Sequence, residues 1–221
     1  MTPELTPNLQ STRGGTNAIF LDRDGTILKE IHGPNQDDHE NLGYLLRVEQ
    51  VELIKDSAKA IAKARGLGYK IIVITNQSAI ARGWLTEDTL REINNKMYTL
   101  LREADPLAII DDLFFCPYHV DGTIEKYKRQ DPCRKPDTGM IMEAVAKHRI
   151  DLSKSYLIGD SYTDIKCGIN AGTKTILLKT GYGSIAYRKC LDERLKIDFI
   201  ADNLFEAIKY IEEKDVVSKK L

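Results

Sequence analysis

Neither sign of charge is in excess in this 221-residue sequence, because 32 basic residues are balanced by 33 acidic ones and the formal net charge is −1. Such a balance gives no overall attraction for nucleic acid or for an anionic membrane, so we expect neither partner. No apolar run approaches the roughly 20 residues that a membrane-spanning helix needs. Residues 1–17, MTPELTPNLQSTRGGTN, contain no apolar signal-peptide core. We therefore expect a cytoplasmic protein.

Cysteine is scarce, and nucleotide-binding patterns are almost absent. The four cysteines are expected to be reduced in the cytoplasm, without a disulfide framework: they are Cys116, Cys133, Cys167 and Cys190. No P-loop pattern G-x-x-x-x-G-K-[ST] occurs. The segment 181–186, GYGSIA, imitates the dinucleotide fingerprint but follows the last strong apolar run. We predict a flexible loop there.

What the sequence does contain is an alternation of short apolar runs with helix-like stretches. Strands are predicted at 18–21, 70–74, 113–116, 155–158 and 174–178. Helices are predicted at 56–66, 86–104, 138–148, 162–171 and 204–213. Continuous β-branched strands that alternate with helices indicate an α/β fold with a doubly wound parallel sheet, similar to a Rossmann fold. We expect residues 1–16 to be a disordered lead-in and residues 17–221 to form a single domain.

Polar residues follow the predicted strands at the points where the strands end. The segment 22–26, DRDGT, comes directly after the first strand, and 75–77, TNQ, comes after the second. The third strand is followed, after a loop, by 133–136, CRKP, and the fourth runs into 159–164, GDSYTD. Ligands of parallel sheets bind outside the carboxyl ends of the strands. The sequence therefore predicts a functional site at this edge of the sheet.

Four aspartates of these segments would crowd together at that edge: Asp22, Asp24, Asp160 and Asp164. Like charges at short distance repel unless a cation lies between them. Hard carboxylate ligands suit Mg²⁺. For Asp164 two interpretations stay open, a metal ligand or a residue that begins the following helix and supports the site.

The residue types also suit phosphoryl transfer, in which catalysis is mostly positioning and charge neutralisation. Thr75 offers a hydroxyl and Lys135 an ammonium for the phosphoryl group. A carboxylate held against the phosphate can attack it and form an acyl-phosphate, which is the role we predict for Asp22. Asp24, two residues on, can protonate the leaving oxygen and later activate water.

Four strings in this chain resemble, in order and spacing, the motifs of the haloacid dehalogenase-like phosphatases: FLDRDGTI, ITNQSAIARG, CRKPDTGM and GDSYTD. The match covers about residues 18–180 and is similar to the branch that contains D-glycero-D-manno-heptose 1,7-bisphosphate phosphatase and histidinol phosphatase. The resemblance implies that Asp22 is the nucleophile, Asp24 the acid/base, and that Asp22, the Asp24 carbonyl and Asp160 hold Mg²⁺. It implies that the phosphoryl group and the rest of the substrate are bound by Thr75, Asn76, Gln77, Arg82, Arg134 and Lys135.

The resemblance implies a Mg²⁺-dependent phosphomonoesterase that removes the 7-phosphate of the heptose bisphosphate, because NQSAIARG is closer to the heptose enzyme. Alternatives are a phosphatase for histidinol phosphate or another small sugar phosphate, or a non-catalytic protein that binds a phosphorylated ligand. We expect a monomer. The gaps between the motifs, at residues 28–55 and 78–132, leave no room for a cap domain. We therefore predict a capless enzyme whose selectivity comes from loops 29–48 and 117–132.

Enzymes of the family that this chain resembles carry a zinc-binding loop whose pattern resembles C-x-H…C-x-C. This chain departs from that pattern. Cys116 and Cys133 occupy the outer positions, but Tyr118 replaces the histidine and Asp131 replaces a cysteine. His119 lies one residue later than the expected histidine. Structural zinc needs four closed ligands, and the spacing here is altered. We expect packing and hydrogen bonds to hold the loop, with zinc on Cys116, His119, Asp131 and Cys133 as the alternative.

Overall fold

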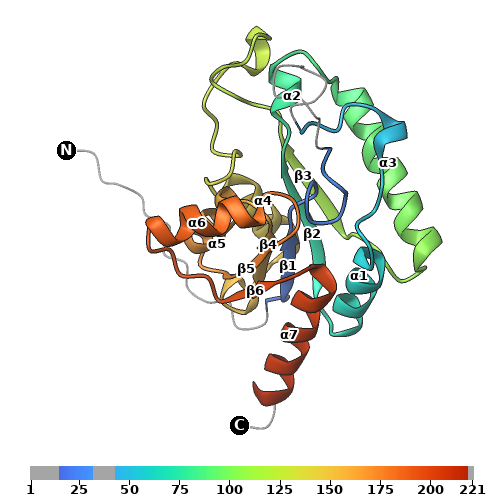
Figure 1. Cartoon of the computed structure of the whole chain (residues 1–221), viewed down its shortest axis with the longest axis vertical. Coiled ribbons are helices and arrows are strands. Elements are labelled where there is room, and N and C mark those ends of the chain that lie inside the picture. The colour runs from blue at the N-terminus through green and yellow to red at the C-terminus, as the bar shows by residue number, and fades with distance from the viewer. Residues whose placement is uncertain (1–14, 32–42, 219–221) are drawn as a thin grey trace.

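A computed structural model of the chain describes residues 15–31 and 43–218 (Figure 1). The expected lead-in therefore lies outside the described residues up to position 14, as do residues 32–42 of the predicted substrate loop. Thr16, assigned by sequence to the lead-in, forms a parallel bridge with Ile150. Within the described ranges, no helix is long and apolar enough to cross a membrane.

Six parallel strands form one sheet in the order β3-β2-β1-β4-β5-β6. Their bounds are β1 Ala18–Leu21, β2 Lys70–Asn76, β3 Asp112–Cys116, β4 Tyr156–Gly159, β5 Lys174–Leu178 and β6 Phe199–Ala201. The chain winds outward from β1 to β3, then returns to place β4 against the free side of β1, with Leu21 in register with Ile158. This is a doubly wound sheet, and the order reverses between β1 and β4.

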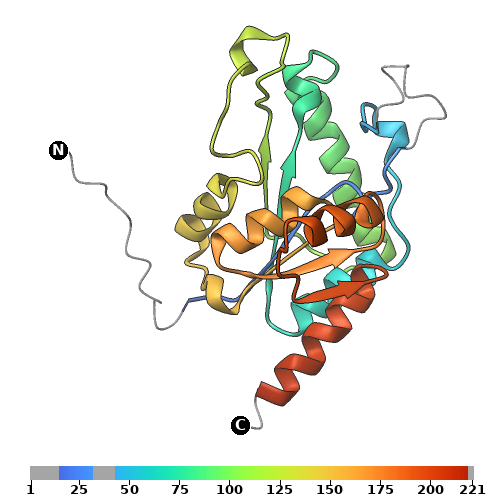
Figure 2. The same ribbon diagram turned by 60° about the vertical axis from the view of Figure 1, so that its left-hand side comes forward.

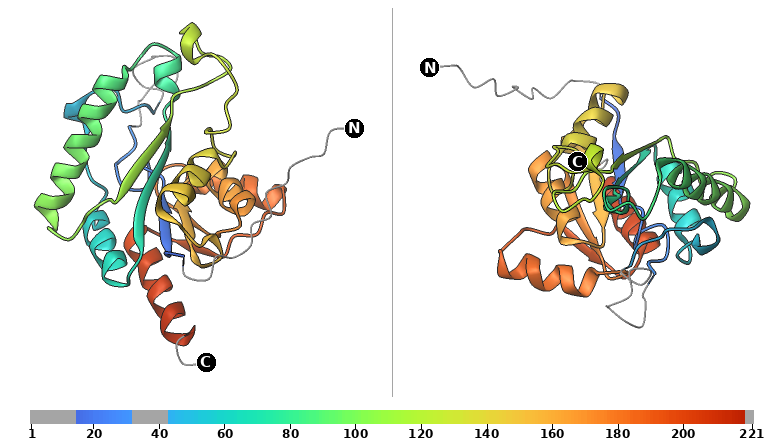
Figure 3. Two further views of the ribbon diagram at one scale, coloured as in Figure 1. Left: turned by 180° about the vertical axis from the view of Figure 1, so that it is seen from behind. Right: turned by 90° about the horizontal axis from the view of Figure 1, so that it is seen from above.

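Helices cover both faces of the sheet, because the buried strands carry apolar side chains on both sides. In β1, Ile19 and Leu21 belong to one core cluster, while Ala18 and Phe20 belong to another. Helices α1 (Ser57–Gly66), α3 (Glu87–Ala104) and α7 (Leu204–Ser218) pack on the first face. Helices α4 (Gly139–His148), α5 (Tyr162–Ala171) and α6 (Gly183–Asp192) pack on the second. Figures 2 and 3 show the sheet between these two layers.

The predicted α/β fold is confirmed, and each predicted strand and helix is present. Among the α-helices and strands of the described residues, three were not predicted: the short helix α2 (Ser78–Ala81), α6 and β6. The flexible loop predicted for 181–186 is wrong, since α6 begins at Gly183 and buries Ala186 and Cys190 against the sheet. In the part of the chain that the structure describes, neither gap named above contains a cap domain; the second one holds α2, α3 and β3.

Candidate active site

All the predicted site residues except Arg82 line a cleft of about 260 Å³ at the carboxyl ends of β1, β2 and β4. A wider groove of about 410 Å³ runs between α3 and residues 108–113. Its acidic residues already have partners on other elements, since Asp111 pairs with Arg65 and Asp112 with Lys147. The cleft lies where the strand order reverses, which is the usual ligand position in open α/β sheets. We therefore assign the chemistry to the cleft.

Two carboxylates of the cleft, Asp22 and Asp160, and the buried Asp164 beside them place one oxygen each within 4.8 Å of one another. Burial raises the pKa of Asp22 and of Asp160, and the neighbouring carboxylates raise both further. The Lys135 ammonium opposes this shift at Asp22. A hard divalent cation would relieve the remaining repulsion, and the oxygen donors suit Mg²⁺.

The turn after β1 brings the main chain directly against Asp160. Gly25 has a φ of +77°, and a Cβ atom built there would lie 2.2 Å from Asp160 Oδ2. Both the left-handed backbone and the lack of space require glycine at this position. The glycine of the DRDGT segment therefore allows the strand-end aspartates of β1 and β4 to share one site.

Lys135 holds the carboxylates together from the opposite side. Its Nζ donates to Asp22 Oδ1 at 2.7 Å, to Asp164 Oδ1 at 2.5 Å and to the Ile74 carbonyl at 2.9 Å. These three bonds use all the donors of an ammonium group. Burial lowers the pKa of Lys135, but the charges of Asp164 and Asp22 outweigh it and hold that pKa above its ordinary value.

Asp164 both begins a helix and supports the site. Its Oδ2 accepts from the Ser161 N–H at 3.0 Å, while its own N–H donates to Ser161 Oγ at 3.2 Å, which is a capping box. Its Oδ1 is the oxygen that Lys135 contacts. Since both oxygens have protein partners, the geometry favours the helix-start and supporting interpretation over that of a metal ligand.

The carboxylate of Asp24 faces the cleft and is 24% exposed. Gln77 Nε2 donates to Asp24 Oδ2 at 2.9 Å and to Thr75 Oγ1 at 2.8 Å. The guanidinium of Arg23 binds the same carboxylate with two hydrogen bonds, of 3.1 and 2.8 Å. The candidate acid/base and the candidate phosphate-binding hydroxyl are therefore joined through one amide.

Asn76 lines the cleft, but its side chain is engaged with the main chain of Lys135. Its Nδ2 donates to the Lys135 carbonyl at 3.1 Å, and its Oδ1 accepts from the Lys135 N–H at 3.0 Å. This two-point contact fixes the segment that carries the buried ammonium.

The two candidate arginines lie in different places. Arg134 lines the cleft, whereas Arg82 is not among the residues lining it and has its guanidinium 5.4 Å from the ring centre of Trp84. Burial lowers the pKa of Arg134, and the positive charge of Arg82 lowers it further. Arg134 and Arg82 therefore lie close enough to repel each other, and together they place positive charge at the rim of the cleft, next to the predicted phosphate site.

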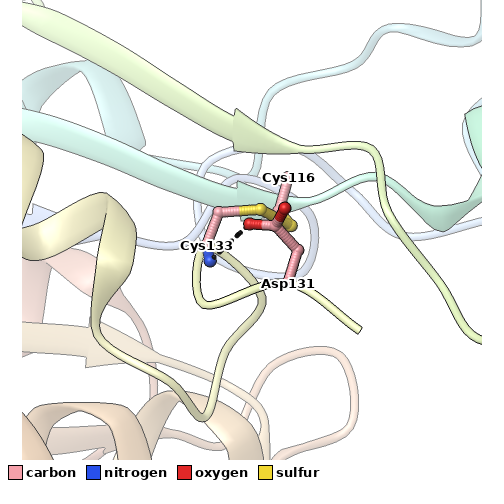
Figure 4. A group of neighbouring side chains, drawn as sticks. All are labelled: Cys116, Asp131 and Cys133. Atoms are coloured by element: carbon pink, nitrogen blue, oxygen red, sulfur yellow. Dashed lines mark hydrogen bonds between the residues drawn. A yellow bond between two sulfur atoms is a disulfide. The ribbon is translucent and has the colours of Figure 1, made fainter. Parts of the chain in front are cut away.

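Cys116 and Cys133 form a disulfide, so the expectation that all four cysteines are reduced is wrong for this pair (Figure 4). The N–H of Gln77 donates to the Cys116 carbonyl at 2.8 Å, and the Asn76–Lys135 contacts hold the other end. These contacts leave the two Cα atoms 5.4 Å apart, within the range of a disulfide. Cys167 and Cys190 are free and buried.

The four residues considered for zinc are only partly assembled. Cys116, Asp131 and Cys133 place their ligand atoms within 4.8 Å of one another, which leaves a possible second metal site when the sulfurs are reduced. His119 lies outside this group, and its Nδ1 accepts from the Asp121 N–H at 3.1 Å. The loop is held instead by the disulfide and by the 3.1 Å bond from the Cys133 N–H to Asp131.

Sequence reasoning did not single out Tyr182 or Glu30, which both line the cleft, although Glu30 lies in the predicted substrate loop 29–48. The Tyr182 N–H donates to Asp160 Oδ2 at 2.8 Å, and Glu30 lies where burial, together with Asp24 and Asp22, raises its pKa to about 8. The signal for Tyr182 was the GYGSIA segment, which resembles a loop when read alone. No local pattern singles out Glu30.

The fold is that of the haloacid dehalogenase-like phosphatases. The family model described as HAD-hydrolase-like matches residues 132–207. The structure is similar to D,D-heptose 1,7-bisphosphate phosphatase from B. bronchiseptica, solved with magnesium and phosphate, with a TM-score of 0.72 at 26% identity. The similarity covers 90% of this chain and 99% of that one.

Comparison with curated relatives identifies one family within this class of phosphatases. D-glycero-alpha-D-manno-heptose-1,7-bisphosphate 7-phosphatase from Photorhabdus laumondii is 36% identical over 87% of this chain and 95% of its own. D-glycero-beta-D-manno-heptose-1,7-bisphosphate 7-phosphatase from Haemophilus ducreyi is 32% identical over 89% of this chain and 99% of its own. The chain belongs to the D-glycero-D-manno-heptose-1,7-bisphosphate 7-phosphatase family.

Proposed function

We propose that this protein is a Mg²⁺-dependent phosphomonoesterase that hydrolyses the 7-phosphate of D-glycero-D-manno-heptose 1,7-bisphosphate. The observation that carries the proposal is the buried Lys135 ammonium, which contacts Asp22 and Asp164 beside Asp160 at the reversal point of the sheet. Relatives that cover most of the chain are named for this reaction.

Asp22, Asp160 and the Asp24 carbonyl are the groups that would hold Mg²⁺. When bound, the ion supplies positive charge that orients the phosphoryl group and neutralises its oxygens. From the protein side, Lys135 places positive charge beside the same oxygens, and the Thr75 hydroxyl offers them a hydrogen-bond donor. Because the buried Lys135 keeps its proton, it offers fixed charge to the transition state without reorganisation.

In the first step, a carboxylate oxygen of Asp22 attacks phosphorus. The new bond gives an aspartyl-phosphate, while the bond from phosphorus to the sugar oxygen breaks and Asp24 donates a proton to that oxygen. In the second step, Asp24 takes a proton from water as the water oxygen attacks phosphorus. The bond to Asp22 breaks, phosphate leaves, and both aspartates return to their starting states.

The remaining residues serve binding and orientation in this proposal. Gln77 orients Asp24, and Asn76 fixes the Lys135 main chain. Arg134, with Arg82 behind it, supplies positive charge for the second phosphate of the substrate. We also propose that residues 17–221 form one catalytic domain and that the protein acts as a cytoplasmic monomer.

The test is kcat/KM with Mg²⁺ for both anomers of the heptose bisphosphate, compared with histidinol phosphate and simple sugar phosphates. We expect a preference of at least about 100-fold for one heptose anomer, or about 2.7 kcal/mol of transition-state binding. Weak and even rates would retain the phosphatase chemistry and remove the heptose assignment. No turnover of any compound would favour a phosphate-binding protein without catalysis.

A further inference from the structure

Asn94 occupies a position on α3 where a polar side chain is unusual. It is only 7% exposed, and its neighbours on the same helix face are Leu90, Ile93 and Met97, all buried. A buried amide without a partner destabilises a protein, so an asparagine here requires a specific contact. That contact is Arg23, whose Nη1 donates to Asn94 Oδ1 at 2.9 Å.

Arg23 is itself fully buried, which is costly for a guanidinium unless its donors are satisfied. Its Nε and Nη2 bind the two oxygens of Asp24 in a fork, and its Nη1 binds Asn94. Because the guanidinium is planar and rigid, fixing one nitrogen fixes the direction of the other two. The orientation of Arg23 therefore depends on α3, which is remote in sequence from the Asp24 turn.

The Asp24 carboxylate is held from two sides. Gln77 donates to Oδ2 at 2.9 Å from the β2 end, and the Arg23 fork holds both oxygens from the α3 side. Without Asn94, the guanidinium would keep its pairing with Asp24 but lose the point that sets its direction. The carboxylate could then rotate with it away from the leaving oxygen.

We propose that Asn94 is a positioning residue that, through Arg23, aims Asp24 at the leaving-group oxygen. This inference deepens the proposed function and rests on the assignment of Asp24 as the acid/base. It predicts that removing the Asn94 acceptor impairs proton delivery while leaving phosphate binding intact.

The experiment compares three full-length variants with the wild type. Asn94→Leu removes the acceptor at nearly constant volume, and Asn94→Asp keeps an acceptor in the same shape. Asn95→Leu makes the same chemical change at the next, exposed residue and serves as the matched control. Circular dichroism and thermal melting verify that each variant is folded.

For the heptose bisphosphate, we expect Asn94→Leu to lose about tenfold in kcat with KM within about twofold. Asn94→Asp should stay within about threefold of the wild type, and Asn95→Leu should be unchanged. The inference is overturned if Asn94→Leu matches Asn95→Leu, or if Asn94→Asp loses as much as Asn94→Leu.

A second measurement separates positioning from general damage. An alkoxide leaving group needs the proton from Asp24, whereas nitrophenolate leaves readily without one, so 4-nitrophenyl phosphate should show almost no loss of kcat/KM in Asn94→Leu. Equal losses for both substrates would assign Asn94 a merely structural role. A wild-type enzyme that does not hydrolyse the heptose bisphosphate would instead reject the proposed function.

Discussion

At the scale of single residues, Lys135 is the group on which we expect both the stability and the chemistry of the site to depend. It is 3% exposed between two carboxylates that are themselves buried. We expect Lys135→Met to lower the unfolding free energy by about 3–5 kcal/mol, because it leaves Asp22 and Asp164 buried without their cation. Urea unfolding in chelator measures this.

Lys63→Met is a suitable control for that variant. Lys63 pairs with Glu212 in a half-exposed site, and its loss should cost less than about 1 kcal/mol. The interpretation fails if the two variants are equally destabilised. Adding Asp164→Asn to Lys135→Met should recover part of the stability, since it removes one of the two charges that were left unpaired.

Asp22 can be tested without disturbing the fold. Asp22→Asn keeps an oxygen that accepts from Lys135 but removes the nucleophile, so we expect hydrolysis to fall by at least about 10³-fold. The melting temperature should change little. The matched control is Asp88→Asn, at an exposed residue of α3 that pairs with Arg91. Wild-type turnover by Asp22→Asn would rule out the aspartyl-phosphate route.

Individual residues were predictable where their chemistry stands in a short pattern. Asp22, Asp24 and Asp160 directly follow buried strands, so their meeting at one sheet edge could be derived from the sequence. Asn94 could not be, because its proposed role comes from Arg23, which is remote in sequence. The sequence shows the residue type but not which buried group needs it.

At the scale of elements, prediction succeeded where burial leaves a continuous signal. The strand β2 is apolar from Ile71 to Ile74, and only its end at Asn76 was missed. The helix α6 was missed because its first residues are glycine and serine, and its buried face consists of the small side chains Ala186 and Cys190. Packing against β5, and not local periodicity, makes that segment helical.

The loop between β3 and α4 offers a prediction at this scale. The Cys116–Cys133 disulfide closes a loop over a sequence separation of 17, so reduction should lower the unfolding free energy by about 3 kcal/mol in the chain-entropy account. Because Arg134 and Lys135 directly follow Cys133, we also expect reduction to raise KM. Urea unfolding and kinetics with and without dithiothreitol measure both effects.

Two variants determine whether that effect belongs to this pair. Cys133→Ser should be insensitive to dithiothreitol, while Cys190→Ser should respond like the wild type because Cys190 is free. Near-stoichiometric zinc in the reduced protein would contradict a loop without metal. It would show that the two sulfurs and Asp131 serve an ion instead.

At the scale of the whole molecule, the doubly wound topology is what turns strand ends into a site. The order β2-β1-β4 places the residues after β1 between those after β2 and β4, although they are remote in sequence. Alternation of strands and helices predicts a parallel sheet but not its strand order. No strand order was predicted, because several windings satisfy the same periodicity.

The last prediction concerns how the folded chain responds to pH and Mg²⁺. The folded pKa values of Asp22 and Asp160 are raised above those of unfolded aspartate, near 3.8, so without a divalent cation the folded state holds more protons. The stabilising contribution of these groups is therefore complete below about pH 4 and is lost as the pH rises towards neutrality and above. Bound Mg²⁺ favours the ionised carboxylates and removes this loss.

The increase in melting temperature caused by Mg²⁺ should therefore grow between about pH 5 and about pH 8. At a Mg²⁺ concentration 100 times the dissociation constant, bound Mg²⁺ should raise the free energy of unfolding by about 2.7 kcal/mol. The difference in melting temperature between samples with chelator and samples with Mg²⁺ is measured at each pH. This difference cancels the contribution from the titration of groups remote from the cleft. Asp160→Asn should lose most of the increase, and a gain independent of pH in the wild type would show that these carboxylates are not the ligands.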